Sequence, residues 1–168
     1  MSTSVSINTF THSTAYVTDK MLSSLKWIIF WSGLDPDKLT RDWASLELGI
    51  KTWLRSRHLE RVTLEIYLPS SMSLVGRWDF DVVYSYGSSD DGSMWVDTDA
   101  IRFAIKKAGV DPKRCSYRII VHTKPGSPSV EGWEPAELLS TSGLVRQSVG
   151  TAIGTNDVSS RVSYWRKA

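Results

Sequence analysis

The sequence lacks most of the residue patterns on which metal chemistry and covalent cross-linking depend. One cysteine, Cys115, stands among 168 residues, which excludes a disulfide framework and any zinc or iron–sulfur site built from several cysteines. The three histidines, His12, His58 and His122, are 46 and 64 residues apart, so no closely spaced pair is available to hold a metal. We therefore expect a reduced environment, no metal and no cofactor.

Signals for membrane insertion and secretion are also missing. The longest apolar run, residues 27–31, is far too short to cross a bilayer. The first residues, MSTSVS, contain neither the basic nor the apolar region of a signal peptide. These absences predict a cytoplasmic protein without a membrane partner.

The net charge is only +2, but the charge is unevenly distributed. Residues 1–101 carry 9 basic and 13 acidic side chains, a net −4, whereas residues 102–168 carry 11 and 5, a net +6. Such polarity can steer a partner. The isoelectric point of about 8.7 lies below the range typical of nucleic-acid-binding domains, so we do not expect direct nucleic-acid binding. Six basic residues are nevertheless candidates for a patch: Lys106, Lys107, Lys113, Arg114, Arg118 and Lys124.

Hydrophobic periodicity predicts two helices at the start of the chain. Residues 11–32 repeat apolar side chains at helical spacing and stop before Gly33. The pair Asp35-Pro36 then suits the start of a second helix, because aspartate caps a helix and proline fits its first turn. This second helix carries the clearest apolar stripe in the chain: Leu39, Trp43, Leu46, Ile50 and Trp53.

A third helix is predicted to run to Lys107 and to end at Gly109. Asp97 and Asp99 precede it, and their spacing resembles that of a metal-binding aspartate pair. Their position directly before a helical stripe favours helix capping instead.

The other periodic segments alternate with a period of two and predict strands. Residues 62–68 and 78–84 form a predicted antiparallel hairpin with one buried face, and residues 117–121 form a third strand. The chain after Pro125 is rich in serine, glycine and proline and contains only two weak strand-like runs, 143–149 and 158–165. Its tryptophans are too apolar for a freely solvated tail, so we expect this part to dock on the core.

One carboxylate cluster suggests an enzymatic alternative. Asp79 and Asp81 share a face of their strand and come close to Glu65 if the hairpin pairs in that register. Three carboxylates could hold a divalent cation, which makes a small carboxylate-dependent metal enzyme the alternative function. The neighbouring Arg61 and Arg77 favour an ordinary charge-paired, solvated face.

Six segments, taken together, resemble one known family. They are 9–22 (TFTHSTAYVTDKML), 32–36 (SGLDP), 49–54 (GIKTWL), 95–99 (WVDTD), 123–126 (TKPG) and 164–166 (YWR). The family is that of the bacterial HORMA-domain proteins of CBASS anti-phage operons, and the likeness covers essentially the whole chain.

The resemblance implies an α+β fold in which three helices pack on an antiparallel sheet and a C-terminal safety belt wraps a closure-motif peptide. It implies a non-enzymatic protein with no catalytic residues. The closed, peptide-bound form would bind and activate a CD-NTase, a cGAS-like nucleotidyltransferase, and an AAA+ ATPase would reopen it. A second HORMA-domain protein is a further candidate partner.

Carried over to this sequence, the resemblance divides a single domain into a mobile N-terminal segment (1–11), a core (12–124) and a safety belt (125–168). The ATPase would grip Ser2, Thr3, Ser4 and Val5. The peptide would pair with the strand at 116–123 and would contact Phe103, Tyr117, Ile119, Val121 and Trp133. The belt would hold it through Leu144, Val145, Val149, Tyr164 and Trp165. We expect a chain without the belt to keep a folded core.

Overall fold

The computed structural model describes residues 9–85 and 93–168. The helices and strands are α1 (Thr9–Trp31), α2 (Asp37–Arg41), α3 (Trp43–Arg55), β1 (Leu59–Leu68), β2 (Ser73–Tyr84), β3 (Trp95–Val96), α4 (Thr98–Ala108), β4 (Ser116–Thr123), β5 (Leu144–Gly154) and β6 (Val158–Lys167). The predicted ATPase handle, residues 2–5, lies outside the described residues. Residues 9–11, which we expected to belong to a mobile segment, form the first turn of α1.

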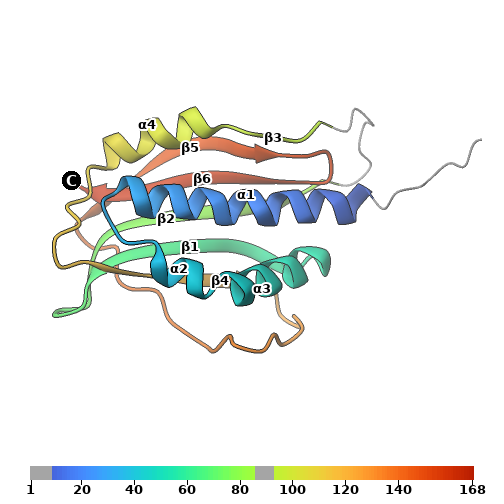
Figure 1. Ribbon diagram of the computed structural model, residues 1–168, viewed down its shortest axis with the longest axis horizontal. Helices are drawn as coiled ribbons and strands as arrows, with labels where there is room; N and C mark the ends of the chain where they lie inside the picture. Colours follow the sequence, from blue (N-terminus) through green and yellow to red (C-terminus); the bar gives the residue numbers. More distant parts are fainter. Residues whose placement is uncertain (1–8, 86–92) are drawn as a thin grey trace, which may run out of the picture.

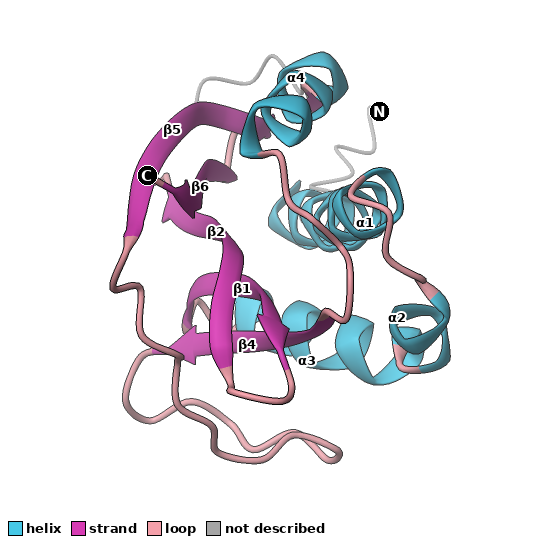
Figure 2. Cartoon of the chain, turned by 90° about the vertical axis from the view of Figure 1, so that its left-hand side faces the viewer, coloured by secondary structure: helices cyan, strands magenta, loops and turns pink. Residues whose placement is uncertain are grey.

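Six antiparallel strands form one sheet in the order β3-β5-β6-β2-β1-β4. Helix α1 crosses one face of the sheet and packs against α3 on one side and α4 on the other (Figure 1). Figure 2 shows that α4 covers the β5 end of the sheet, whereas α2 and α3 lie at the β4 end. The sheet therefore has two dissimilar ends. None of the helices in the described ranges combines the length and the apolar character that a membrane span requires.

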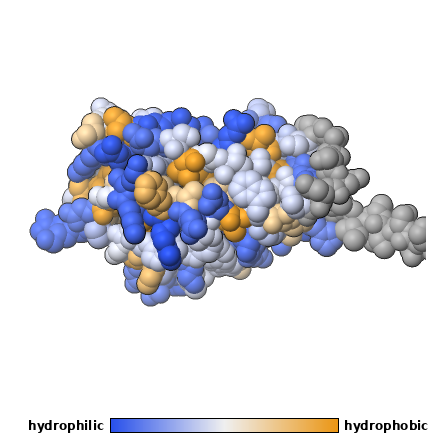
Figure 3. Space-filling view, turned by 90° about the horizontal axis from the view of Figure 1, so that it is seen from above, coloured by the Kyte–Doolittle hydropathy of each residue, from blue (hydrophilic) through white to orange (hydrophobic). Residues whose placement is uncertain are grey.

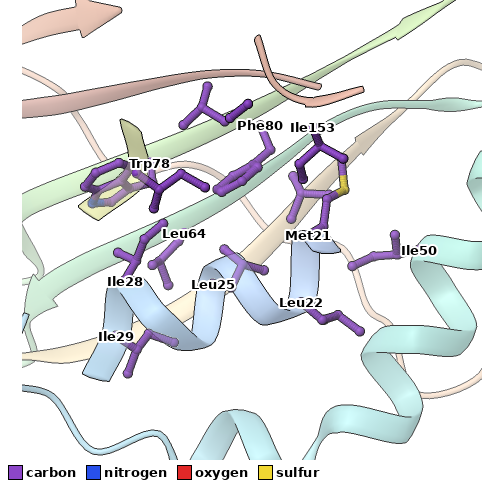
Figure 4. Packing of buried hydrophobic residues seen from close by; sticks show 14 of the residues in the cluster. Met21, Leu22, Leu25, Ile28, Ile29, Ile50, Leu64, Trp78, Phe80 and Ile153 are labelled. Carbon is purple, nitrogen blue, oxygen red and sulfur yellow. The ribbon is translucent and has the colours of Figure 1, made fainter. Parts of the chain in front are cut away.

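The core lies between α1 and the middle of the sheet. Leu25 of α1 points toward Phe80 of β2, and Met21 of α1 lies beside Ile153 of β5 (Figure 4). All four side chains are completely buried, and each contributes roughly 1.5–3 kcal/mol of hydrophobic stabilisation. The 3.6-residue periodicity of α1 and the two-residue periodicity of the hairpin thus meet in a single interface.

The start and stop signals of the third predicted helix are confirmed in α4. The Asp97 carboxylate accepts a hydrogen bond from the Ala100 amide at 3.0 Å. Gly109 ends the helix in the left-handed region, at φ +56°, where glycine is strongly favoured. The second predicted helix is divided at Asp42 into α2 and α3, so four helices take the place of the three that we expected.

The hairpin of β1 and β2 is buried on both faces, whereas we expected one solvated face. On the face away from the helices, Glu65 is 0% exposed and Asp79 is 3% exposed. The indole Nε1 of Trp165 donates to the Asp79 carboxylate at 3.1 Å, and the amide of Leu139 donates to Glu65 at 2.7 Å. The C-terminal part of the chain therefore covers this polar face.

The C-terminal strands belong to the core of the molecule. β6 pairs with β2 in the centre of the sheet, and β5 pairs with β6. Ile153 and Val162 are buried in the same hydrophobic cluster as α1. A boundary at residue 124 does not separate a core from an appendage, and removing residues 125–168 would take two interior strands out of the sheet. The folded state of a chain without residues 125–168 stays a prediction, and the interior position of β5 and β6 weighs against it.

Candidate functional site

The outer edge of β4 offers a long stretch of strand that pairs with no other strand in the described ranges. β4 has eight residues and is the last strand of the sheet. The carbonyl of Tyr117 is turned toward α2, where it accepts a hydrogen bond from Lys38 Nζ at 2.9 Å. Because backbone groups alternate in direction along a strand, the N–H and C=O groups of Ile119 and Val121 face the same way. These groups could pair with an added strand.

Helices α2 and α3 form one wall beside this edge, and Tyr117 holds α2 to β4. Its buried hydroxyl donates to the carbonyl of Asp35 at 2.7 Å and accepts a hydrogen bond from the Leu39 amide at 3.2 Å. Burial raises the pKa of this hydroxyl, and the negative charges of Asp35 and Asp37 raise it further. The phenol therefore stays protonated at neutral pH and keeps both hydrogen bonds.

Residues 124–143, which we call the crossing segment, connect β4 to β5 and form the second wall. The indole Nε1 of Trp133 donates to the carbonyl of Ser45 at 3.0 Å, and that of Trp53 donates to the carbonyl of Pro128 at 2.7 Å. The two rings meet edge to face at 5.1 Å. A Cβ atom on Gly49 would lie 2.3 Å from Trp133 Nε1, so the indole needs a glycine in α3.

The far end of the crossing segment is fixed to the opposite face of the sheet. The Nε atom of Arg118 donates to Glu65 at 2.6 Å, and the other carboxylate oxygen of Glu65 accepts from Leu139. Arg118 also donates to the carbonyl of Glu137 at 2.5 Å. We call these contacts the polar clamp. The segment thus touches α3 on one side of the sheet and the clamp on the other, so it passes around the edge of β4, as its course below β4 in Figure 2 shows.

Two hollows lie between these walls and follow the strand edge. One has a volume of about 280 Å³ and is lined by Leu46, Tyr117 and Ile119. The other has a volume of about 240 Å³ and is lined by Val121 and Pro128. Trp133 lines both. We call this arrangement of edge, walls and hollows the β4 channel. Its backbone edge and its alternating hollows suit an extended peptide.

The structure brings together four of the five residues that we expected to contact a peptide. Tyr117, Ile119, Val121 and Trp133 line the β4 channel. Phe103 does not, because it lies on α4, which covers the opposite end of the sheet (Figures 1 and 2). The helical wall comes from α2 and α3 instead.

The residues that we expected to act in the belt lie in β5 and β6: Leu144, Val145, Val149, Tyr164 and Trp165. Tyr164 stacks on Trp78 with a ring separation of 5.0 Å, so these strands support the sheet. The segment that passes around the edge of β4 is the crossing segment (Figure 2). Sequence reasoning missed the polar clamp and Gly49, although a glycine inside a helical pattern can signal a packing requirement.

The carboxylates of the alternative metal site are each engaged by a basic side chain. Asp79 accepts from Arg77 Nε at 2.9 Å and from the Thr63 hydroxyl at 2.8 Å. Asp81 pairs with Arg61 at 2.6 Å, and Glu65 belongs to the polar clamp. Within residues 9–85 and 93–168, no group of three or more acidic, histidine or cysteine side chains is arranged to hold a metal ion.

One protein-family model matches nearly the whole chain. The model described as "Bacterial HORMA domain 2" matches residues 2–168. No curated protein sequence matches significantly.

Solved structures with the same fold come from several sources. A chain in the crystal structure of a mitotic checkpoint complex superposes with a TM-score of 0.68 at 10% identity, over 90% of this chain and 99% of the other. C. elegans HTP-2 bound to HTP-3 closure motif 1 gives 0.66 at 9% identity, over 90% and 86%. The E. coli MS115-1 CdnC:HORMA-deltaN complex gives 0.57 at 11% identity, over 94% and 89%. At these identities the likeness shows a shared fold.

Proposed function

Because the chain belongs to the bacterial HORMA domain family, we propose that it captures a short closure-motif peptide in the β4 channel and acts as a peptide-gated switch. The outer edge of β4, which pairs with no other strand of the described residues and is enclosed by the crossing segment, is the observation that supports this proposal. Main-chain hydrogen bonds to Ile119 and Val121 supply affinity, and the hollows beside Trp133 supply sequence preference. The protein thus works by binding and not by catalysis.

The crossing segment makes release slow. A peptide inside the channel lies between β4 and a segment that is fixed at Trp133 on one side and at Glu65 on the other. It can leave only after one of these attachments opens. Burial of an aromatic ring such as Trp133 contributes on the order of 2 kcal/mol, and the clamp adds charge-assisted hydrogen bonds. Several such contacts together produce a high barrier to opening.

A slow switch needs an external source of energy, and we assign this role to an AAA+ ATPase that pulls on residues 1–8. The first contacts under load lie at the start of α1. The Ser13 hydroxyl donates to Asp157, between β5 and β6, at 2.7 Å. The guanidinium of Arg57 lies 3.8 Å from the ring of Phe10. Pulling on residues 1–8 loosens the start of α1 from the sheet and from the hairpin of β5 and β6.

The output of the switch is proposed to be a CD-NTase, which the closed, peptide-bound form binds and activates to make a nucleotide second messenger. The fold shared with the E. coli CdnC:HORMA-deltaN complex supports this assignment. A second HORMA-domain protein could occupy the same place or supply the peptide. Nucleotide synthesis by the cognate CD-NTase, measured with and without peptide, tests this step.

Removal of residues 1–8 separates activation from reopening. We expect this variant to bind peptide and to activate the CD-NTase normally, but to resist ATP-dependent disassembly. Disassembly at the full-length rate would show that the ATPase grips another segment, without affecting the proposal for peptide capture.

Peptide capture itself is tested by a proline at the strand edge. A peptide selected from a phage-displayed library supplies the probe. The Ile119→Pro variant removes one N–H that points away from β1, and proline is tolerated where the N–H of an edge strand faces outward. We expect it to lose at least about tenfold in affinity while keeping its fold, whereas the Ile119→Val control keeps the N–H and binds normally. Equal binding by both variants would refute pairing along β4.

A further inference from the structure

The end of the molecule opposite the β4 channel carries basic side chains that form no salt bridge with any acidic side chain of the described residues. They come from α4, from the loop after it and from the end of β6, and we call them the basic face: Arg102, Lys106, Lys107, Lys113, Arg166 and Lys167. A hollow of about 270 Å³ is lined by residues of α4 and by both Arg166 and Lys167. The helix and the end of β6 therefore form one continuous surface.

The charges of the basic face are free to act on a ligand. No salt bridge joins any of its six residues to an acidic side chain within the described ranges. Elsewhere, Arg61, Arg77 and Arg118 are all paired with carboxylates. Asp111 lines the hollow, and its carboxylate accepts the backbone N–H of Lys113 at 3.1 Å. The six basic side chains outnumber Asp111 and the exposed Asp99 of the first turn of α4, so this surface carries a net positive charge.

Aromatic rings lie among these charges. Phe103 is 61% exposed on α4, and the ammonium of Lys107 lies 4.8 Å from its ring centre. The guanidinium of Arg102 lies 4.4 Å from the ring of Trp31, which stacks on Trp27. A second hollow, of about 560 Å³, opens between Trp31, Arg102 and Lys106. Figure 3, which looks onto the α4 side, shows strongly hydrophilic residues interspersed with hydrophobic ones over this end.

We propose that the basic face binds single-stranded nucleic acid, with its ammonium and guanidinium groups on the phosphates and Phe103 stacked on a base. Basic side chains interleaved with exposed aromatic rings are the pattern of single-strand binding. An acidic protein partner fits less well, because four of the six basic residues are lysines, which protein interfaces disfavour. This surface differs from the patch suggested by the sequence, since Arg118 belongs to the polar clamp and Lys124 follows β4.

The overall isoelectric point of about 8.7 does not indicate this surface. It averages an acidic N-terminal part and a basic C-terminal part, whereas a phosphate backbone responds to the local charge within a Debye length of about 8–10 Å. The basic face and the β4 channel lie at opposite ends of the sheet, so each can be altered without touching the other.

The test measures the binding of a labelled oligothymidine of about 20 nucleotides by fluorescence anisotropy, with about 50 to 200 mM salt. We expect affinity to fall steeply with salt. The Lys106→Glu/Lys107→Glu variant should lose at least about tenfold in affinity and should reduce the salt slope by about 1.4, or 0.7 per lost phosphate contact. The matched control, Arg41→Glu/Arg55→Glu, changes two exposed residues of α2 and α3 by the same charge and should change affinity less than about threefold.

Phe103→Ala distinguishes a single-strand site from a general binder of polyanions. It should weaken oligothymidine binding about fivefold or more and leave binding to a duplex of the same length unchanged. Three results would overturn the proposal: no binding at low salt, an equal loss in both charge-reversal variants, or equal competition by poly-glutamate. An effect of Phe103→Ala on neither ligand would likewise exclude stacking. Peptide capture by the Lys106→Glu/Lys107→Glu variant should stay normal, which shows that this variant is folded.

Discussion

The hairpin of β5 and β6 and the crossing segment both follow β4 in the chain, but they are held in different ways. The hairpin occupies interior positions of the sheet and buries Ile153, Val162 and Tyr164. The crossing segment contains no regular strand or helix and is held by Trp133, by Pro128 and by the polar clamp. The hairpin is therefore part of the stable fold, and the segment beside it is the part that can open.

This difference matters for a switch. Opening the hairpin exposes a continuous apolar surface. The free energy of this opening is therefore close to that of global unfolding. Opening the crossing segment breaks a few hydrogen bonds and one aromatic contact, so its free energy lies at the lower end of the range that native proteins show. Four predictions follow this contrast from the largest expected effect to the smallest.

The largest effect is expected in the hairpin. Ile153→Ala removes a completely buried side chain from the core (Figure 4) and should lower the free energy of unfolding by about 2–5 kcal/mol in urea titrations. Val145→Ala, on the same strand but 37% exposed, is the matched control and should cost less than about 0.5 kcal/mol. Equal losses at the two positions would contradict the interior role of β5.

The polar clamp should show a smaller loss of stability. Glu65→Ala leaves the Leu139 amide and the Nε atom of Arg118 without their acceptor and should cost about 1–3 kcal/mol, together with faster proteolysis between residues 124 and 143. Asp81→Ala breaks a more exposed pair with Arg61 and should cost about 0.2–1 kcal/mol without promoting cleavage there. Unchanged proteolysis of Glu65→Ala would show that the clamp does not hold the segment.

Gly49→Ala should affect peptide capture and global stability in different ways. The added Cβ displaces the Trp133 indole, so we expect peptide affinity to fall about tenfold, or about 1.4 kcal/mol. Alanine favours the helix by about 1 kcal/mol over glycine. This gain offsets the contacts that the displaced Trp133 indole loses, so the urea midpoint should hardly move. Trp133→Ala should reproduce the loss of affinity, and the double variant should lose no more than either single one. Fully additive losses would mean that the two residues act separately.

The smallest effect is a dependence on pH at Tyr117. Its pKa is raised in the folded protein, so between the unfolded and folded pKa values the unfolded state has lost a proton that the folded state keeps. Stability from this group is complete below about pH 10 and declines above it. The advantage of the wild type over Tyr117→Phe, measured in urea, should shrink as the pH rises above about 10. A constant difference would show that the phenol ionises equally in both states.

Much of the fold could be predicted because its signals are local. The cap at Asp97, the stop at Gly109 and the alternation in the hairpin each depend on neighbours in the sequence. The β4 strand and Trp133 were also expected at the site, one from its alternation and the other from the family resemblance.

The contacts that the sequence did not reveal join residues far apart in the chain. Glu65 and Leu139 are 74 positions apart in the sequence but form a hydrogen bond. Hydrophobic periodicity cannot predict such a pair. Phe103 was placed at the wrong end of the sheet because nothing in the sequence orders the strands. The polar face of the hairpin was expected to be solvated because the groups that cover it, Trp165 of β6 and Leu139 of the crossing segment, lie far away in the sequence.

Amide hydrogen exchange in the native state tests the central contrast most directly. It compares the Leu139 amide, which reports the crossing segment, with the Val162 amide in β6. We predict that Leu139 exchanges through a local opening several kcal/mol cheaper than the global unfolding that limits Val162, and that bound peptide slows only Leu139. Exchange of both amides with the same free energy, unchanged by peptide, would contradict a segment that opens while the hairpin stays in place.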